Sequence, residues 1–145
     1  MRRFLWLTLA MTVLPALASA QTIEGAWRLA EYSSDGGETV RNAESLMIIA
    51  GGHYSRLFVR TNETRETPTT DTERVAVWEP FVANSGTYTV SGSTFTFTPV
   101  VAKMPSASRS PVTLQFTVNG NELVLTGNAE GATDTMQRWV RVGGM

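Results

Sequence analysis

The fold of this chain is decided by residues 25–30, which read Gly-Ala-Trp-Arg-Leu-Ala. They belong to a run over 23–32 in which apolar and polar residues alternate, the pattern of a strand with one buried face. Trp27 and Leu29 share one face of this strand. Gly25 lets the chain enter the floor of a small barrel without a steric cost, and the indole of Trp27 is large enough to fill that end. The Gly-x-Trp pattern therefore predicts a barrel built around a cavity.

Residues 1–20 have the pattern of a secretory signal peptide. Arg2 and Arg3 give a basic start, residues 4–14 are apolar, and 18–20 read Ala-Ser-Ala, a small-residue cleavage site. The apolar stretch is too short to span a bilayer comfortably. We therefore expect cleavage after Ala20, a periplasmic or secreted protein with no stable membrane insertion, and one barrel domain over residues 21–145.

The composition excludes several function classes. The signal peptide holds two of the 12 basic residues and none of the 13 acidic ones, so the mature chain has ten basic against 13 acidic residues, a formal charge of −3. This mild acidity argues against nucleic acid or an anionic membrane as a partner. The chain has no Cys and one His, which excludes disulfides, thiol catalysis and metal sites built from Cys or several His residues. We expect neither a metal nor a cofactor.

Most of the remaining chain reads as short amphipathic strands separated by turn residues. Gly51-Gly52 and Asn119-Gly120 have the residues of tight hairpin turns. We expect a mainly β fold, a single antiparallel up-and-down barrel with one short helix and about eight strands, at 23–32, 46–50, 53–60, 86–90, 94–98, 112–118, 122–126 and 134–142. The polar segment 60–72 and the segments 101–111 and 127–133 are expected to be loops.

The helix is predicted over 72–83. Asp71 is a suitable N-cap, and the apolar residues Val75, Trp78, Phe81 and Val82 recur at helical spacing. Pro80 fits poorly in a helix interior, which predicts a kink or two short turns.

Several segments resemble the bacterial lipocalin-like domain proteins. Residues 25–29 resemble that family's opening Gly-x-Trp-Arg-Leu, and 81–90, with Gly86-Thr87-Tyr88, resemble its central segment. Residues 119–125 and 139–142 are similar to its last hairpin and its ending. The resemblance implies a lipocalin-type barrel over nearly the whole mature chain. It also implies a structural closure of one end, in which Gly25 and Trp27 pack under an Arg of the last strand, Arg141 or Arg138.

Aromatic residues are the candidates for a ligand pocket, although barrel interiors need large side chains in any case. We single out five residues that combine apolar area with a polar group or lie among the aromatic strands: Tyr54, Arg56, Trp78, Tyr88 and Phe97. Tyr54, Arg56 and Phe58 alternate along 53–60 and so share a face. His53 is the one candidate general base, with Tyr54 and Arg56 as neighbours, or else an exposed turn residue beside Gly51-Gly52.

Three functions follow from these residues, in order of preference. The first is a non-enzymatic exported protein that holds a small, mostly hydrophobic molecule in the barrel cavity. The second is a protein-interaction or inhibitor module that acts through the 60–72 and 101–111 loops and has a protein partner. The third is a small isomerase or hydratase, which requires His53, Tyr54 and Arg56 to point into one pocket.

Overall fold

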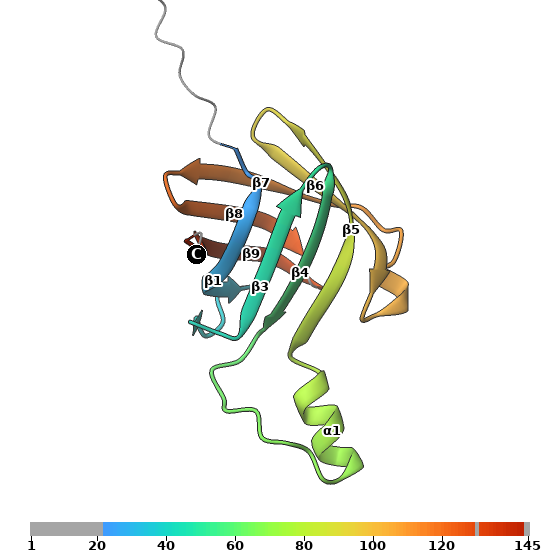
Figure 1. Ribbon diagram of the computed structural model, residues 1–145. Helices are drawn as coiled ribbons and strands as arrows, with labels where there is room; N and C mark the ends of the chain where they lie inside the picture. Colours follow the sequence, from blue (N-terminus) through green and yellow to red (C-terminus); the bar gives the residue numbers. More distant parts are fainter. Residues whose placement is uncertain (1–21, 130, 144–145) are drawn as a thin grey trace, which may run out of the picture.

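The computed structural model describes residues 22–129 and 131–143, so the expected signal peptide lies outside the described residues. The strands are β1 (Gly25–Ser34), β2 (Val40–Arg41), β3 (Ser45–Ala50), β4 (His53–Val59), β5 (Phe81–Ser91), β6 (Thr94–Ala102), β7 (Val112–Asn119), β8 (Glu122–Ala129) and β9 (Ala132–Arg141) (Figure 1). One α-helix, α1 (Asp71–Trp78), lies between β4 and β5, and a short 3-10 turn, Pro105–Ala107, lies between β6 and β7.

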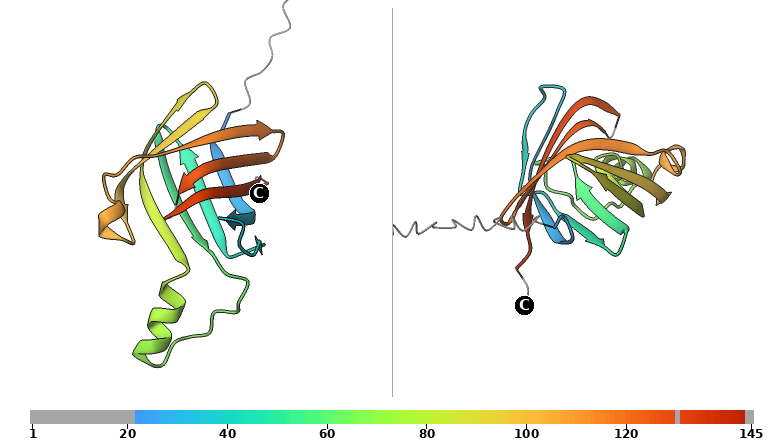
Figure 2. Two further views of the ribbon diagram at one scale, coloured as in Figure 1. Left: turned by 180° about the vertical axis from the view of Figure 1, so that it is seen from behind. Right: turned by 90° about the horizontal axis from the view of Figure 1, so that it is seen from above.

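The strands form one closed antiparallel barrel. β1 pairs with β3, and from β3 to β9 each strand pairs with the next along the chain. β1 also pairs with β9 from Trp27↔Arg141 to Ser34↔Thr135, which closes the sheet (Figure 2). The two-residue β2 is not a separate strand of the barrel wall. It pairs with residues 31–32 of β1, on the same edge of β1 that pairs with β3 at residues 25–27. The result is an eight-stranded barrel, which confirms the predicted fold class.

The two ends of the barrel differ. The tight hairpin turns after β3, β5 and β7 lie at the end where β1 begins and β9 ends, and we call this the closed end. Gly51, Gly52 and Gly120 take positive φ angles of 55°, 77° and 60°, as two-residue turns require. The longer connections, residues 60–80 and 103–111, lie at the opposite end, which we call the open end.

Alternation along the strands fills the barrel interior. Inward side chains of the long strands are buried or, as for most of those on β7, half-buried. The largest that are fully buried include two tryptophans and three phenylalanines: Trp27, Trp139, Phe58, Phe95 and Phe97. Edge-to-face contacts join Phe58 to Trp139 and Phe95 to Phe97, with ring centroids 5.7 and 4.4 Å apart. Packing of this kind occupies much of the space between the strands, so free volume is left mainly near the open end.

The helix differs from its prediction. It spans Asp71–Trp78, and its N-cap is Thr70, whose side chain accepts a hydrogen bond from the Glu73 backbone N–H. Pro80 ends the helical segment instead of kinking it, and the chain enters β5 at Phe81. No residue of α1 is buried, and Figure 1 shows the helix beyond the open end of the barrel.

Two expected loops also proved shorter. The segment 127–133 is mostly strand, since β8 runs to Ala129 and β9 begins at Ala132. Residues 101–102 extend β6, and only 103–111 form a connection. Gly127 and Gly131 interrupt the apolar alternation in the first segment and Pro99 precedes the second, but backbone pairing reaches Ala129 and Ala132 in one and Ala102 in the other.

A cavity at the open end as candidate functional site

A cavity of about 380 Å³ opens between β4, β5, β6 and the β6–β7 connection. Its wall combines apolar side chains with a few polar ones and consists of Arg56, Arg60, Phe81, Val82, Ala83, Asn84, Phe97, Pro99, Ala102, Lys103, Met104, Ser106, Ala107, Ser110, Val112 and Gly131. A volume of this size falls within the range of roughly 300–1,000 Å³ that small-molecule sites occupy.

Arg56 is the buried cation of this wall. Its place on the inward face of β4 leaves it 2% exposed, between Tyr54 and Phe58 in the alternation. Its guanidinium carbon lies 4.4 Å from the ring centroid of Phe97 and 5.7 Å from that of Phe58. Nε donates to Oδ1 of Asn84 at 3.2 Å, across the β4–β5 pair that places the two residues opposite each other. Cation–π contacts and this hydrogen bond offset part of the cost of burying the charge.

Lys103 fastens the β6–β7 connection to the end of α1. Its Nζ donates to the carbonyl oxygens of Trp78, Glu79 and Phe81, at 2.5, 3.2 and 2.8 Å. The same ammonium lies 5.2 Å from the Trp78 ring centroid. Burial lowers the pKa of Lys103, and the positive charge of Arg60 lowers it further, against the opposing effect of Glu79. The connection that borders the cavity is thus tied to helix carbonyls that carry partial negative charge.

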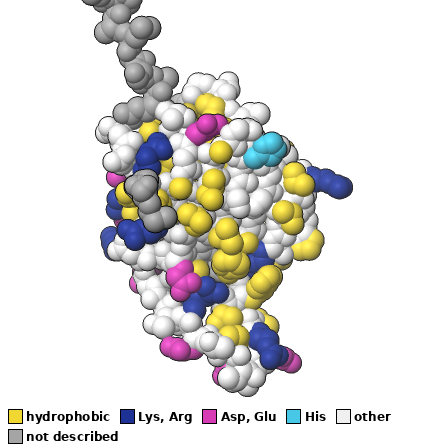
Figure 3. Space-filling model, in the orientation of Figure 1, with side chains coloured by type: hydrophobic (Ala, Val, Ile, Leu, Met, Phe, Trp, Pro, Cys, Tyr) yellow, Lys and Arg dark blue, Asp and Glu magenta, His cyan; other side chains and the backbone are white. Residues whose placement is uncertain are grey.

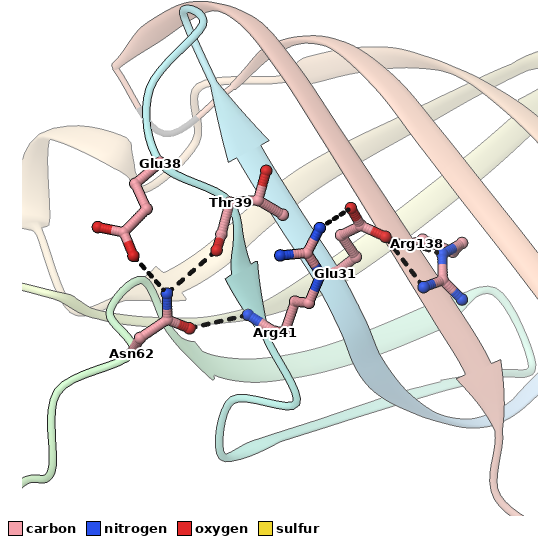
Figure 4. Close-up of polar contacts among 6 residues, drawn as sticks. All are labelled: Glu31, Glu38, Thr39, Arg41, Asn62 and Arg138. Atoms are coloured by element: carbon pink, nitrogen blue, oxygen red, sulfur yellow. Dashed lines mark hydrogen bonds and ion pairs between the residues drawn. The ribbon is translucent and has the colours of Figure 1, made fainter.

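A second, more polar hollow of about 530 Å³ lies beside the first, and Arg60 belongs to the walls of both. A chain of polar contacts follows this side of the barrel mouth (Figure 4). Asn62 accepts a hydrogen bond from the Arg41 backbone N–H at 2.9 Å and donates to Glu38 and to the Thr39 carbonyl. These bonds join the start of the 60–80 connection to the turn before β2. We read this network as structural, because each of its bonds holds one connection to another.

Further contacts carry the network to the last strand. The carboxylate of Glu31 lies between two arginines, with Oε1 3.5 Å from Arg41 Nη2 and Oε2 2.9 Å from Arg138 Nη2 (Figure 4). Arg138 also reaches Glu122 at 3.5 Å, and Glu31 is the largest cause of its raised pKa. Arg138 is therefore engaged by carboxylates on the outer side of the barrel.

Arg141, and not Arg138, meets Trp27 at the closed end. Its guanidinium carbon lies 4.1 Å from the Trp27 ring centroid, and its two Nη atoms donate to the carbonyls of Glu24 and Thr22 at 2.7 and 3.0 Å. Gly25 has φ 143°, and a Cβ at this position would lie 2.3 Å from Arg141 Nη1. The structure thus brings together the three residues expected to close the barrel.

Two of the five residues expected in the pocket line the cavity, Arg56 and Phe97. Tyr54 is buried next to them, with its ring centroid 4.7 Å from that of Phe97, but does not belong to the wall. Tyr88 lies toward the closed end, where its hydroxyl donates to Glu24 at 2.9 Å, and its pKa is raised by burial and by that carboxylate. Trp78 is 53% exposed on α1.

His53 lies on the outside of the barrel. It is exposed at the start of β4, on the face opposite to Tyr54 and Arg56, and its Nδ1 lies 3.0 Å from the Gly51 carbonyl oxygen. The single His side chain is visible on the surface in Figure 3. This arrangement contradicts the isomerase or hydratase hypothesis, which required His53, Tyr54 and Arg56 to converge in one pocket.

Most residues of the cavity wall were not singled out from the sequence, and Asn84, Arg60 and Lys103 are the ones with amide or charged side chains. Asn84 alternates with the inward Val82 and Gly86 on β5, but it fell between the helix predicted over 72–83 and the strand predicted over 86–90. Arg60 was detectable, because the alternation of the strand predicted over 53–60 puts it on the face of Arg56. Lys103 falls in a segment expected to be a loop, where side-chain direction does not follow from a repeat. Within 22–129 and 131–143, the side chains do not form a group of three or more His, Asp or Glu that could hold a metal. None of the helices in those ranges is both long and apolar enough to cross a membrane.

Comparison with known proteins identifies the fold. No family model matches the chain, and no curated protein matches its sequence. Two solved structures are similar. A lipocalin-like protein from Bacteroides uniformis is 14% identical, with a TM-score of 0.52, over 82% of this chain and 97% of that one. An uncharacterised protein from Bacteroides eggerthii is 11% identical, with a TM-score of 0.51, over 82% of this chain and 98% of that one.

The chain therefore has a lipocalin-like fold, as the resemblance in its sequence implied.

Proposed function

We propose that this protein binds a small, mostly hydrophobic molecule in the open-end cavity and does so without catalysing a reaction. The observation that carries the proposal is a concave wall of mainly apolar side chains around one buried polar group, Arg56. Such a combination is typical of ligand sites, because apolar area supplies affinity while a few polar groups fix orientation. A lipocalin-like fold is in keeping with ligand binding, although fold alone does not define a ligand.

The apolar part of the wall comes from three neighbouring strands. Phe81 and Val82 come from β5, Phe97 and Pro99 from β6, and Val112 from the start of β7. Transfer of apolar ligand surface onto these side chains is worth about 25 cal/mol per Å² removed from water. Phe97 is fully buried and its ring packs edge-to-face with Phe95 and at a tilt against Tyr54, so this part of the wall is preorganised.

The proposed function also includes export of the protein from the cytoplasm. The basic start, the short apolar run and the Ala-Ser-Ala site at 18–20 support cleavage after Ala20 and a periplasmic or secreted location. Mass determination of the protein recovered from its own host's periplasm and culture medium tests this. A chain that begins at Gln21 is expected, and an intact chain beginning at Met1 in the cytoplasm would contradict it.

Ligand binding is tested with residues 21–145 and N-phenyl-1-naphthylamine, a neutral fluorescent probe. We expect a saturable rise in fluorescence with one probe per protein. Ala107 lies in the cavity wall, so Ala107→Trp fills the site and should remove most of the rise. Ala50 is exposed at the end of β3, so Ala50→Trp is the matched control and should leave the rise unchanged. No saturable rise, or one that Ala107→Trp leaves intact, would refute binding in this cavity.

A second candidate function, docking of a protein partner at the open end, is favoured by one observation. Apolar side chains near the two connections are strongly exposed, with Trp78 at 53%, Met104 at 55% and Val101 at 63%. More exposed apolar side chains gather on the outer face in Figure 3, and those of β3 and β4 include Leu46, Ile48 and Leu57. A protein that binds no probe, but that loses a co-purifying partner after Trp78→Ser, would support docking instead.

A further inference from the structure

We infer that the molecule held in the cavity is amphipathic and carries a carboxylate, which Arg56 and Asn84 receive while the apolar body lies against Phe81, Val82 and Phe97. This inference rests on the proposed function and names the chemical class of its ligand. Three features of the cavity carry it: the charge of the wall, the hydrogen-bonding character of Arg56 and Asn84, and the apolar surroundings of that pair.

The charged side chains that the described residues contribute to the wall are all cationic: Arg56, Arg60 and Lys103. Arg56 comes from the middle of β4, Arg60 follows the same strand, and Lys103 follows β6. Burial is the largest cause of the lowered pKa of Lys103, and the positive charge of Arg60 lowers this pKa further. A cavity whose described charged side chains are cationic attracts an anion and repels an amine.

The pair Arg56 and Asn84 offers hydrogen-bond donors. An arginine side chain has donors only, so Asn84 must turn its Oδ1 toward Arg56 Nε, as the 3.2 Å contact shows. The amide nitrogen of Asn84 is then left with its two N–H donors, and both residues belong to the cavity wall. A group that only accepts hydrogen bonds complements such a pair best. A carboxylate is such a group, and its two oxygens also match the planar guanidinium.

The surroundings of Arg56 strengthen any charge interaction there. Its guanidinium lies over Phe97 and near Phe58, both fully buried, and the side chain is 2% exposed. Charges interact more strongly in such an environment than in water. A carboxylate at the inner side of the wall is therefore bound more tightly than a hydroxyl on the same chain, while the apolar contacts are equal for both.

The experiment compares ligands that differ only in the head. Decanoic acid, 1-decanol and decylamine compete with N-phenyl-1-naphthylamine for residues 21–145 at pH 7. We expect the acid to displace the probe at a concentration about tenfold or more below that of the alcohol, since a charged hydrogen bond contributes this much. The amine is expected to be the weakest. In Arg56→Met the acid should lose its advantage while the alcohol binds as before.

Control variants separate this inference from the proposed function. Arg28 is exposed on the outside of β1, so Arg28→Met removes the same charge away from the cavity and should keep the advantage of the acid. If Arg56→Met does not fold, Arg60→Gln, half-buried at the opening, should reduce the advantage of the acid in part. A wild type that binds the probe but takes alcohol and acid equally would overturn the carboxylate inference and leave the proposed function standing. Absence of probe binding would overturn both.

Discussion

Replacing Arg141 by methionine measures how much the closed end contributes to the stability of the barrel. The variant removes the guanidinium that lies 4.1 Å from the Trp27 ring centroid and that donates to the carbonyls of Glu24 and Thr22. Methionine keeps an unbranched side chain of similar reach, so packing over the indole is partly preserved. The change therefore reports mainly on the cation–π contact and the two hydrogen bonds.

The expected loss follows from those contacts. A cation–π contact at a partly exposed site is worth about 1 kcal/mol. The two hydrogen bonds to carbonyl oxygens lie at the surface and contribute about 0.5–1 kcal/mol each. We therefore expect Arg141→Met to lower the free energy of unfolding by about 2–3 kcal/mol, a large share of the 5–15 kcal/mol that a domain typically has.

Urea denaturation followed by tryptophan fluorescence measures the loss, with Arg28→Met as the control for removal of an exposed arginine. A second variant, Gly25→Ala, should also destabilise, because its Cβ would lie 2.3 Å from Arg141 Nη1 at a φ of 143°. Part of that clash is with the guanidinium, so the two substitutions should cost less together than their sum. A loss below about 0.5 kcal/mol for Arg141→Met, or strict additivity with Gly25→Ala, would refute this account.

Two further perturbations test the frame of the barrel. Gly86→Ala should lower the free energy of unfolding by about 2 kcal/mol or more in urea denaturation, because its Cβ would lie 2.0 Å from the Thr98 carbonyl oxygen. In the control Gly92→Ala, in the β5–β6 turn, the added Cβ meets no neighbouring atom, so the loss should be smaller. Equal losses for the two variants would contradict the clash at Gly86. Asp35 accepts hydrogen bonds from the Thr133 side chain and from two backbone N–H groups, which hold its pKa below the ordinary 3.8. A carboxylate whose pKa is lowered by folding stabilises the folded protein at pH values above its ordinary pKa, and this stabilisation is lost as the pH falls through the lowered pKa. As the pH falls below about 4, Asp35→Asn should therefore lose less stability than the wild type. Parallel dependences of unfolding free energy on pH for the two proteins would contradict this role of Asp35.

Much of the barrel was predictable because strand alternation and turn chemistry are local properties. The shared inward face of Trp27 and Leu29, that of 53–60, and the turns at Gly51-Gly52 and Asn119-Gly120 were predicted correctly. The bulge after Leu29, which turns Tyr32 inward, was not. The helix boundary was not, because Phe81 and Val82 continue the apolar spacing of α1 although Pro80 separates them from it. Their burial depends on pairing with β4, a contact that no local window contains.

The candidate site could be predicted only in part, since a cavity depends on where connections run. Arg56 and Phe97 were placed correctly on inward faces, but the same rule did not separate them from Tyr54, which is covered by its neighbours. Trp78 was expected in the pocket because it combines apolar area with a polar group, yet α1 extends beyond the barrel and leaves it exposed. Lys103 borders the cavity through three bonds to carbonyls from α1 and β5, and these follow from the tertiary structure alone.

The pairing of Trp27 with Arg141 has a consequence for how the protein is handled. It holds the entry and exit of the described chain at one pole of the barrel, while the cavity opens at the other. A tether attached before residue 22 or after residue 143 therefore leaves the mouth pointing away from its support. Protein coupled in this way to a sensor surface would present its cavity to the passing solution. A peptide that joins these two positions should also permit a circular permutant whose new ends lie at the β5–β6 hairpin.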